Sequence, residues 1–125
     1  MEEQEVYAAV GQEGFERLVA AFYRRIPADS ILGPMYVGRD MAAAEARLRG
    51  FLIYRFGGPQ TYIEERGHPR LRMRHNPFVI DPAARESWIR LMRAALEESN
   101  LQPEARQVLE TFFESTATFL INRPA

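Results

Sequence analysis

Apolar residues recur every three or four positions along most of the chain, which is the spacing of one face of an α-helix. No segment shows the alternation of apolar and polar residues that is typical of a half-buried strand. The pattern therefore predicts an all-α protein. The clearest apolar run consists of Phe15, Leu18, Val19, Phe22, Tyr23 and Ile26.

Capping residues, glycines and prolines mark where the expected helices begin and end. Asp40 can cap the start of a third helix, and Gly57 with the glycine after it stops that helix. Asp81 followed by Pro82 is a start signal for a helix that reaches about Asn100. The expected helices span residues 3–10, 15–26, 41–56, 69–75, 82–100 and 103–120, with a tight connection over 29–36 and a loose turn over 61–65.

Aromatic residues lie on the expected inner faces. Trp88 begins the apolar face of the helix over 82–100, and the inner face of the last helix runs from Ala105 to Leu120 and includes Phe119. Each of these residues taken alone is most often part of an ordinary core. Buried tyrosine and tryptophan side chains nevertheless need partners for their O–H and N–H groups, so Tyr23 and Trp88 also indicate a polar site inside the core.

The stretch over residues 66–78 contains both histidines of the chain. Pro69 suits the first turn of a helix and Pro77 cannot continue one, so we expect a helix of about two turns that ends near His75. Carbonyl groups at a helix C-terminus favour a hydrogen bond from the Nδ1–H of His75 and raise the basicity of its other nitrogen.

The residue types around His75 suit haem, which has an apolar face, an iron and two carboxylates. Leu71 and Met73 alternate here with arginines. The ordinary alternative is that His75 is a surface or hydrogen-bonded core residue. His68 lies about 10 Å from it along a helix, too far to share a metal ion, and a chain without cysteine is a poor candidate for structural zinc.

Length, charge and composition restrict the remaining possibilities. We expect the 125 residues to form a single domain, 1–125, with one core. A net charge of −1 does not indicate a nucleic-acid-binding surface. The absence of cysteine fits a reducing cytoplasm. No apolar run is long enough for a transmembrane helix, and we expect a soluble, cytoplasmic protein.

A family resemblance extends from about Val6 to Leu120. The run Arg66–His75 and the tryptophan in the next helix are its most specific parts. The matching residues are Phe22-Tyr23, Tyr36, Arg47-Leu48-Arg49, Phe51-Leu52, Gly57-Gly58-Pro59, Tyr62, Arg66–His75, Pro77-Phe78, Ile80, Trp88 and Met92. In these residues the chain resembles the truncated haemoglobins of the second group. Two positions differ from the common pattern: the first turn reads Gly11-Gln12-Glu13-Gly14, and Tyr36 stands where phenylalanine is more common.

The resemblance implies a globin-like, two-over-two helical sandwich around one haem b. It makes His75 the proximal iron ligand, with His68 not binding iron. Ala44 takes the place where many globins carry a polar distal residue, and Leu48 lies over the iron. The resemblance further implies a distal group of Tyr23, Tyr36 and Trp88, and it places Phe51 and Phe78 among the haem-binding residues. It implies propionate contacts from Arg47, from Tyr62 and from one or more of Arg72 and Arg74.

These residues suggest a haem protein that binds O2 and also NO and CO. Ferrous haem makes the outer oxygen of O2 partly anionic, and donors already aimed at it stabilise that charge. Trp88 can only donate, whereas Tyr23 and Tyr36 can donate and accept.

Three functions remain open from the sequence. The first is tight O2 retention with redox chemistry, either NO dioxygenation or peroxide reduction, which requires an unidentified electron donor. The second is an O2 carrier, reserve or sensor without catalysis. The third is a helical domain without haem. Enzymatic activity and oligomeric state, including a homodimer, also stay open.

Overall fold

The computed structural model describes residues 1–124, and these residues form helices, turns and loops without any strand. The predicted all-α class is therefore confirmed. The elements are η1 (Glu3–Glu5), α1 (Val6–Arg25), η2 (Ile26–Ala28), α2 (Leu32–Met35), α3 (Met41–Arg55), α4 (Thr61–Arg66), α5 (Leu71–His75), α6 (Pro82–Ser99) and α7 (Pro103–Phe119).

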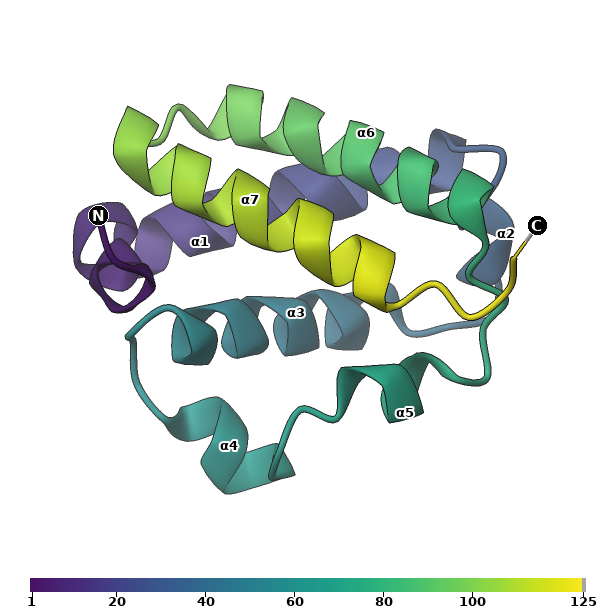
Figure 1. Cartoon of the computed structure of the whole chain (residues 1–125), viewed down its shortest axis with the longest axis horizontal. Coiled ribbons are helices and arrows are strands. Elements are labelled where there is room, and N and C mark those ends of the chain that lie inside the picture. Colours follow the sequence, from purple (N-terminus) through teal and green to yellow (C-terminus); the bar gives the residue numbers. More distant parts are fainter. Residues whose placement is uncertain (125) are drawn as a thin grey trace.

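The long helices form two antiparallel pairs, α1 with α3 and α6 with α7 (Figure 1). The pairs lie on each other mainly through α1, which packs against α6 as well as against α3. This arrangement is the expected two-over-two sandwich. The side chains between the pairs are almost completely buried; the largest include Phe15, Phe22, Phe56, Leu18, Leu52, Met92, Leu96 and Leu109.

Most of the predicted helix boundaries agree with the structure. Asp40 and Asp81 cap α3 and α6, because their carboxylates accept hydrogen bonds from the backbone N–H groups of Ala43 and Ala84 at 3.1 and 2.8 Å. Gly11 interrupts α1 with a φ of 76°. The first expected helix therefore does end near Gly11, but the next helical segment follows directly, so the interruption is a kink within α1.

Two expectations were wrong. The first was that Pro69 would start the helix that carries His75. Arg70 adopts a left-handed conformation, with a φ of 47°, so α5 begins only at Leu71 and contains five residues. The second was that Phe119 would lie in the core. It is the last residue of α7 and is 55% exposed, and the guanidinium of Arg72 lies 5.1 Å from its ring centroid.

The turn after α3 brings the chain into direct contact with the N-terminal segment. Gly57 has a φ of 96°, and a Cβ atom at this position would lie 2.1 Å from the carbonyl oxygen of Gln4. The backbone N–H of Tyr7 donates to the carbonyl of Phe56 at 2.9 Å beside it. A side chain at position 57 would therefore have to displace backbone.

We expect Gly57→Ala to be much more destabilising than Gly38→Ala. Gly38 also has a positive φ, of 76°, but no atom lies within 4 Å of the position that a Cβ atom would occupy there. Gly38→Ala should therefore cost only the conformational strain of about 1–2 kcal/mol. Gly57→Ala adds the clash, and we expect a loss of roughly 3 kcal/mol or more in the free energy of unfolding. Urea denaturation measures both, and equal losses would contradict the close approach.

Candidate functional site

His75 lies at the end of α5 with one ring nitrogen engaged by its own helix. Its Nδ1 is 2.7 Å from the carbonyl oxygen of Leu71. A carbonyl can only accept, so Nδ1 carries a proton, and in the neutral imidazole Nε2 then has the lone pair that can bind a ligand or a metal. This is the bond that the position of His75 near the helix end led us to expect. His68, by contrast, is exposed.

The helix that carries His75 is incompletely packed. α5 has no buried residue and makes little backbone contact with any other helix. Leu71 of α5 and Ala44 and Leu48 of α3 are only half-buried, although they pack against the core. Half-buried apolar side chains, together with an imidazole whose Nε2 has no hydrogen-bond partner among the described residues, fit the chemistry of haem, which needs apolar contacts and an iron ligand.

The structure brings the expected distal aromatic residues together from three separate segments. Tyr23 comes from α1, Tyr36 follows α2, and Trp88 lies in α6. The rings of Tyr23 and Tyr36 meet edge to face, with centroids 6.0 Å apart. Phe22 connects the group, because its centroid lies 5.4 Å from that of Tyr23 and 5.1 Å from that of Trp88.

The polar groups of these residues have different partners. The hydroxyl of Tyr23 donates to the carbonyl of Ala44 at 3.2 Å. Burial raises the pKa of both Tyr23 and Tyr36, so both phenols stay protonated at neutral pH. Within residues 1–124 the indole N–H of Trp88 has no protein acceptor and is not sealed from solvent. The Tyr23 proton is thus engaged, while the Trp88 proton is available.

The expected propionate-binding residues do not form one cluster. Arg74 donates to the hydroxyl of Tyr62 at 3.1 Å and to the carbonyls of Arg66 and His68 at 2.9 and 3.2 Å. Arg47, on α3, is exposed. Arg72, also exposed, lies against Phe119.

The two expected phenylalanines occupy different environments. Phe51 is buried against Tyr62, with ring centroids 5.7 Å apart. Phe78 is half-buried, and its ring centroid is 6.3 Å from that of His75. The guanidinium of Arg39 lies 4.5 Å from the Phe78 centroid, so Phe78 connects the segment after Tyr36 with the segment after His75.

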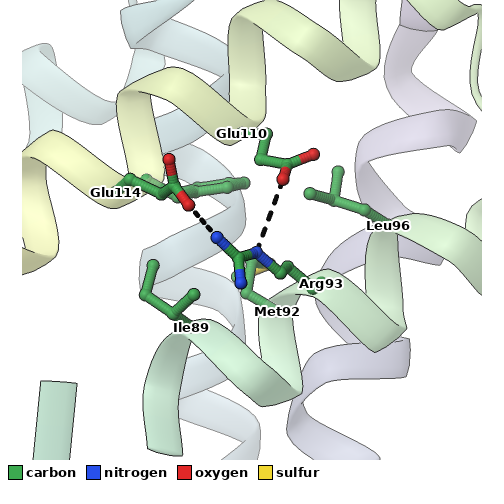
Figure 2. A pocket seen from close by; sticks show the side chains of 7 residues that line it. Ile89, Met92, Arg93, Leu96, Glu110 and Glu114 are labelled. Atoms are coloured by element: carbon green, nitrogen blue, oxygen red, sulfur yellow. Dashed lines mark hydrogen bonds and ion pairs between the residues drawn. The ribbon is translucent and has the colours of Figure 1, made fainter. Parts of the chain in front are cut away.

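A hollow between α6 and α7 is a helix interface. Its lining includes Ile89, Met92 and Phe113, and Figure 2 shows Arg93 reaching across it towards α7. Arg93 forms ion pairs with Glu110, at 3.4 Å, and with Glu114. None of the expected haem-binding residues lines this hollow.

Asp29 holds the segment that leads to Tyr36, and the sequence analysis did not single it out. Its carboxylate accepts from the backbone N–H groups of Leu32 and Ile31 at 2.8 and 3.1 Å and from Arg90 at 2.6 Å. The Leu32 hydrogen bond is the main reason why the pKa of Asp29 lies below its usual value, with the Ile31 bond and Arg90 adding to it. Because Asp29 comes just before the apolar pair Ile31 and Leu32, the sequence could have indicated that it caps this segment. It could not have indicated the contact with Arg90 on α6.

This fold is that of a globin. The chain belongs to the bacterial-like globin family, whose model matches residues 5–122. It is 35% identical over 117 residues to the group 2 truncated hemoglobin YjbI of Bacillus subtilis, covering 94% of this chain and 88% of that protein. The predicted resemblance to group II truncated haemoglobins is confirmed, and membership of the globin family implies a haem cofactor.

Solved structures agree with this assignment. A thermostable hemoglobin from the actinobacterium Thermobifida fusca is 45% identical and superposes with a TM-score of 0.91, covering 96% of this chain and 98% of that one. The truncated oxygen-avid haemoglobin from Bacillus subtilis is 35% identical with a TM-score of 0.88, covering 94% and 98%. Among the described residues, no helix combines the length and hydrophobicity needed to cross a membrane.

We expect Asp29→Asn to remove a pH-dependent contribution to stability. Because folding lowers the pKa of Asp29, its ionised form stabilises the protein above the usual carboxyl pKa of 3.8, and this contribution is lost as the pH falls through the lowered value. The wild type should exceed the variant in urea midpoint at about pH 7 and lose that advantage towards about pH 3. A difference that does not change with pH would refute the ionised cap.

Proposed function

We propose that this chain binds haem b through Nε2 of His75 and that the haem protein binds O2, together with NO and CO. The observation that supports this most directly is the Nδ1–H bond from His75 to the Leu71 carbonyl at 2.7 Å, which orients the ring and makes Nε2 the nitrogen that can bind a metal. Nε2 of His75 would hold the iron. Ala44, Leu48, Phe51 and Phe78 would supply apolar contacts to the macrocycle.

The distal residues support tight retention of O2. When bound, haem would supply an iron that binds O2 and places partial negative charge on it. Because the Tyr23 hydroxyl donates to Ala44, its oxygen can accept from a neighbouring donor. Trp88 and Tyr36 then supply the N–H and O–H groups that meet the ligand. Donors held in place by packing stabilise the charge without reorganisation.

Four residues are candidates to hold the haem carboxylates. Arg47 and Arg72 are exposed and form no ion pair within residues 1–124, so both are available. Arg74 is engaged by Tyr62 and two backbone carbonyls, and Tyr62 is buried. We propose that Arg47 and Arg72 make the direct contacts and that Arg74 with Tyr62 supports them. A charge-assisted bond to a carboxylate is stronger than a neutral one.

Redox chemistry is the reaction class that this site supports. Conversion of NO and O2 to nitrate consumes one electron for each nitrate, and reduction of peroxide to water consumes two electrons and two protons. Both reactions need an external electron donor. The second candidate function is an O2 reserve or sensor, which the tightly held donors also favour. A relative described as oxygen-avid fits either function.

Absorption spectroscopy tests the proposed cofactor and ligand. The chain should bind haem stoichiometrically and give separate ferric, ferrous and O2-exposed spectra. Turnover of NO or peroxide with a chemical reductant then separates catalysis from storage. A chain that does not retain haem would contradict the whole proposal, whereas stable O2 binding without turnover would favour the reserve or sensor.

We expect His75→Gly to abolish the ferrous five-coordinate spectrum, because His75 is the half-buried histidine with an oriented imidazole. Added imidazole should restore the spectrum by taking the place of the missing side chain. His68→Ala is the matched control and should leave the spectrum unchanged, since His68 is exposed. The reverse pattern would assign the iron ligand to His68.

We expect Trp88→Phe to raise the O2 dissociation rate. The change keeps an aromatic ring against Phe22 and Phe113 but removes the N–H donor. A hydrogen bond to a charged group contributes roughly 1.5–3 kcal/mol, which corresponds to roughly 10- to 150-fold in rate. CO carries less charge and should change less. Tyr36→Phe and Tyr23→Phe backgrounds control for reorientation, and an unchanged rate in all three backgrounds would make Trp88 a packing residue only.

A further inference from the structure

Asn122, which follows α7, ties the C-terminal segment to the loop that leaves α5. Its Oδ1 accepts from the backbone N–H of Ile80 at 2.9 Å. Its Nδ2 donates to the carbonyl of Phe78 at 2.9 Å and reaches that of His75 at 3.5 Å. Its own backbone N–H donates to the carbonyl of Ile80 at 2.8 Å. One residue thus holds the backbone from His75 to Ile80.

The chemistry of an amide fits this position in one orientation only. The N–H of Ile80 can only donate, and the carbonyls of Phe78 and His75 can only accept. Turning the Asn122 amide over would therefore place oxygen against oxygen and N–H against N–H. A side chain that both donates and accepts is required here, and aspartate, which has nearly the same shape, provides only acceptors.

Polar contacts at its two ends hold α5 in place, together with the half-buried side chain of Leu71. The helix has no buried residue, and it lies apart from the long helices (Figure 1). Beside it lies a surface groove of about 340 Å³ that is lined by Arg72, Met73, Asn76, Leu120 and Asn122. Arg74 binds the backbone before α5, through the carbonyls of Arg66 and His68. Asn122 is the corresponding contact after it.

We propose that Asn122 is a positioning residue for His75. By fixing the carbonyl end of α5, it sets the direction in which Nε2 of His75 points, although Asn122 itself does not touch the ligand. The inference depends on the proposed role of His75 as the iron ligand. If Asn122 no longer donates to Phe78 and His75, the end of α5 can rotate, the bond from His75 weakens, and haem leaves faster.

The test compares three variants of the full chain loaded with haem. Asn122→Asp keeps the shape and the acceptor for Ile80 but turns the donor into an acceptor. Asn122→Ala removes both groups. The matched control is Ser99→Ala, which removes a buried hydrogen bond inside α6, from Ser99 to the Ala95 carbonyl at 2.7 Å, and does not touch α5.

Two readouts report on the position of His75. Resonance Raman spectroscopy of the ferrous form gives the frequency of the iron–histidine stretch, and transfer to an apo-globin acceptor gives the rate of haem loss. We expect Asn122→Asp and Asn122→Ala to shift the stretch and to speed haem loss roughly tenfold. Ser99→Ala should leave the stretch unchanged. An unshifted stretch in both Asn122 variants would overturn the proposal.

Hydrogen exchange separates this proposal from the assignment of the ligand. In the haem-free chain, both Asn122 variants should speed exchange over residues 71–80, and this measurement does not depend on the identity of the ligand. If His75→Gly leaves the ferrous spectrum intact, the ligand assignment fails, whatever exchange shows. Faster exchange without a shift of the iron–histidine stretch would make Asn122 a purely structural contact and would overturn the positioning role.

Discussion

The packing of α1 is the constraint on which the rest of the structure depends. Its apolar face is shared, because α1 packs against α3 in its own pair and against α6 in the other. Phe15, Leu18 and Phe22 are almost completely buried there. Burial of apolar surface is the dominant favourable term in folding, so the relative position of the two pairs is set mainly on this side of the molecule. The opposite side, between α3 and α5, is left half-packed.

The two halves of the candidate site are consequently held by different forces. Tyr23 and Trp88 lie on long helices whose neighbouring side chains are buried, so the core fixes their positions. His75 lies on a helix of five residues with none buried, and hydrogen bonds from Arg74 and Asn122 fix its surroundings. Hydrogen bonds are directional, and a directional constraint suits a residue whose ring nitrogen must point along one line.

The hydrogen bonds that Tyr23, Tyr36 and Trp88 form or leave open distinguish these three aromatic residues. A phenol has a single proton to donate, and that of Tyr23 is directed to the Ala44 carbonyl. This bond also joins α1 to α3 beside the site. The oxygen of Tyr23 can therefore still accept from a neighbour, while the indole N–H of Trp88 has no competing acceptor among the described residues. Burial keeps the phenol of Tyr36 protonated and able to donate.

The sequence by itself determined the features that depend on near neighbours in the chain. Asp40 and Asp81 cap helices because their carboxylates reach N–H groups three residues ahead. The proton on Nδ1 of His75 could likewise be predicted, since its acceptor, Leu71, lies one helical turn back. The spacing of apolar residues along α1 also identified the core, because it depends only on residues three or four positions apart. The arrangement of the helices and the cofactor came from the family resemblance.

Only the tertiary structure decided which distant groups meet. The left-handed conformation of Arg70 moved the start of α5, and Phe119 turned out of the core towards Arg72. Asn122 has no pattern around it that indicates a role, because its partners lie 42 or more residues away in the chain. Such contacts follow from how the helices pack, and packing is decided by the sum of many small interactions that no local stretch of sequence contains.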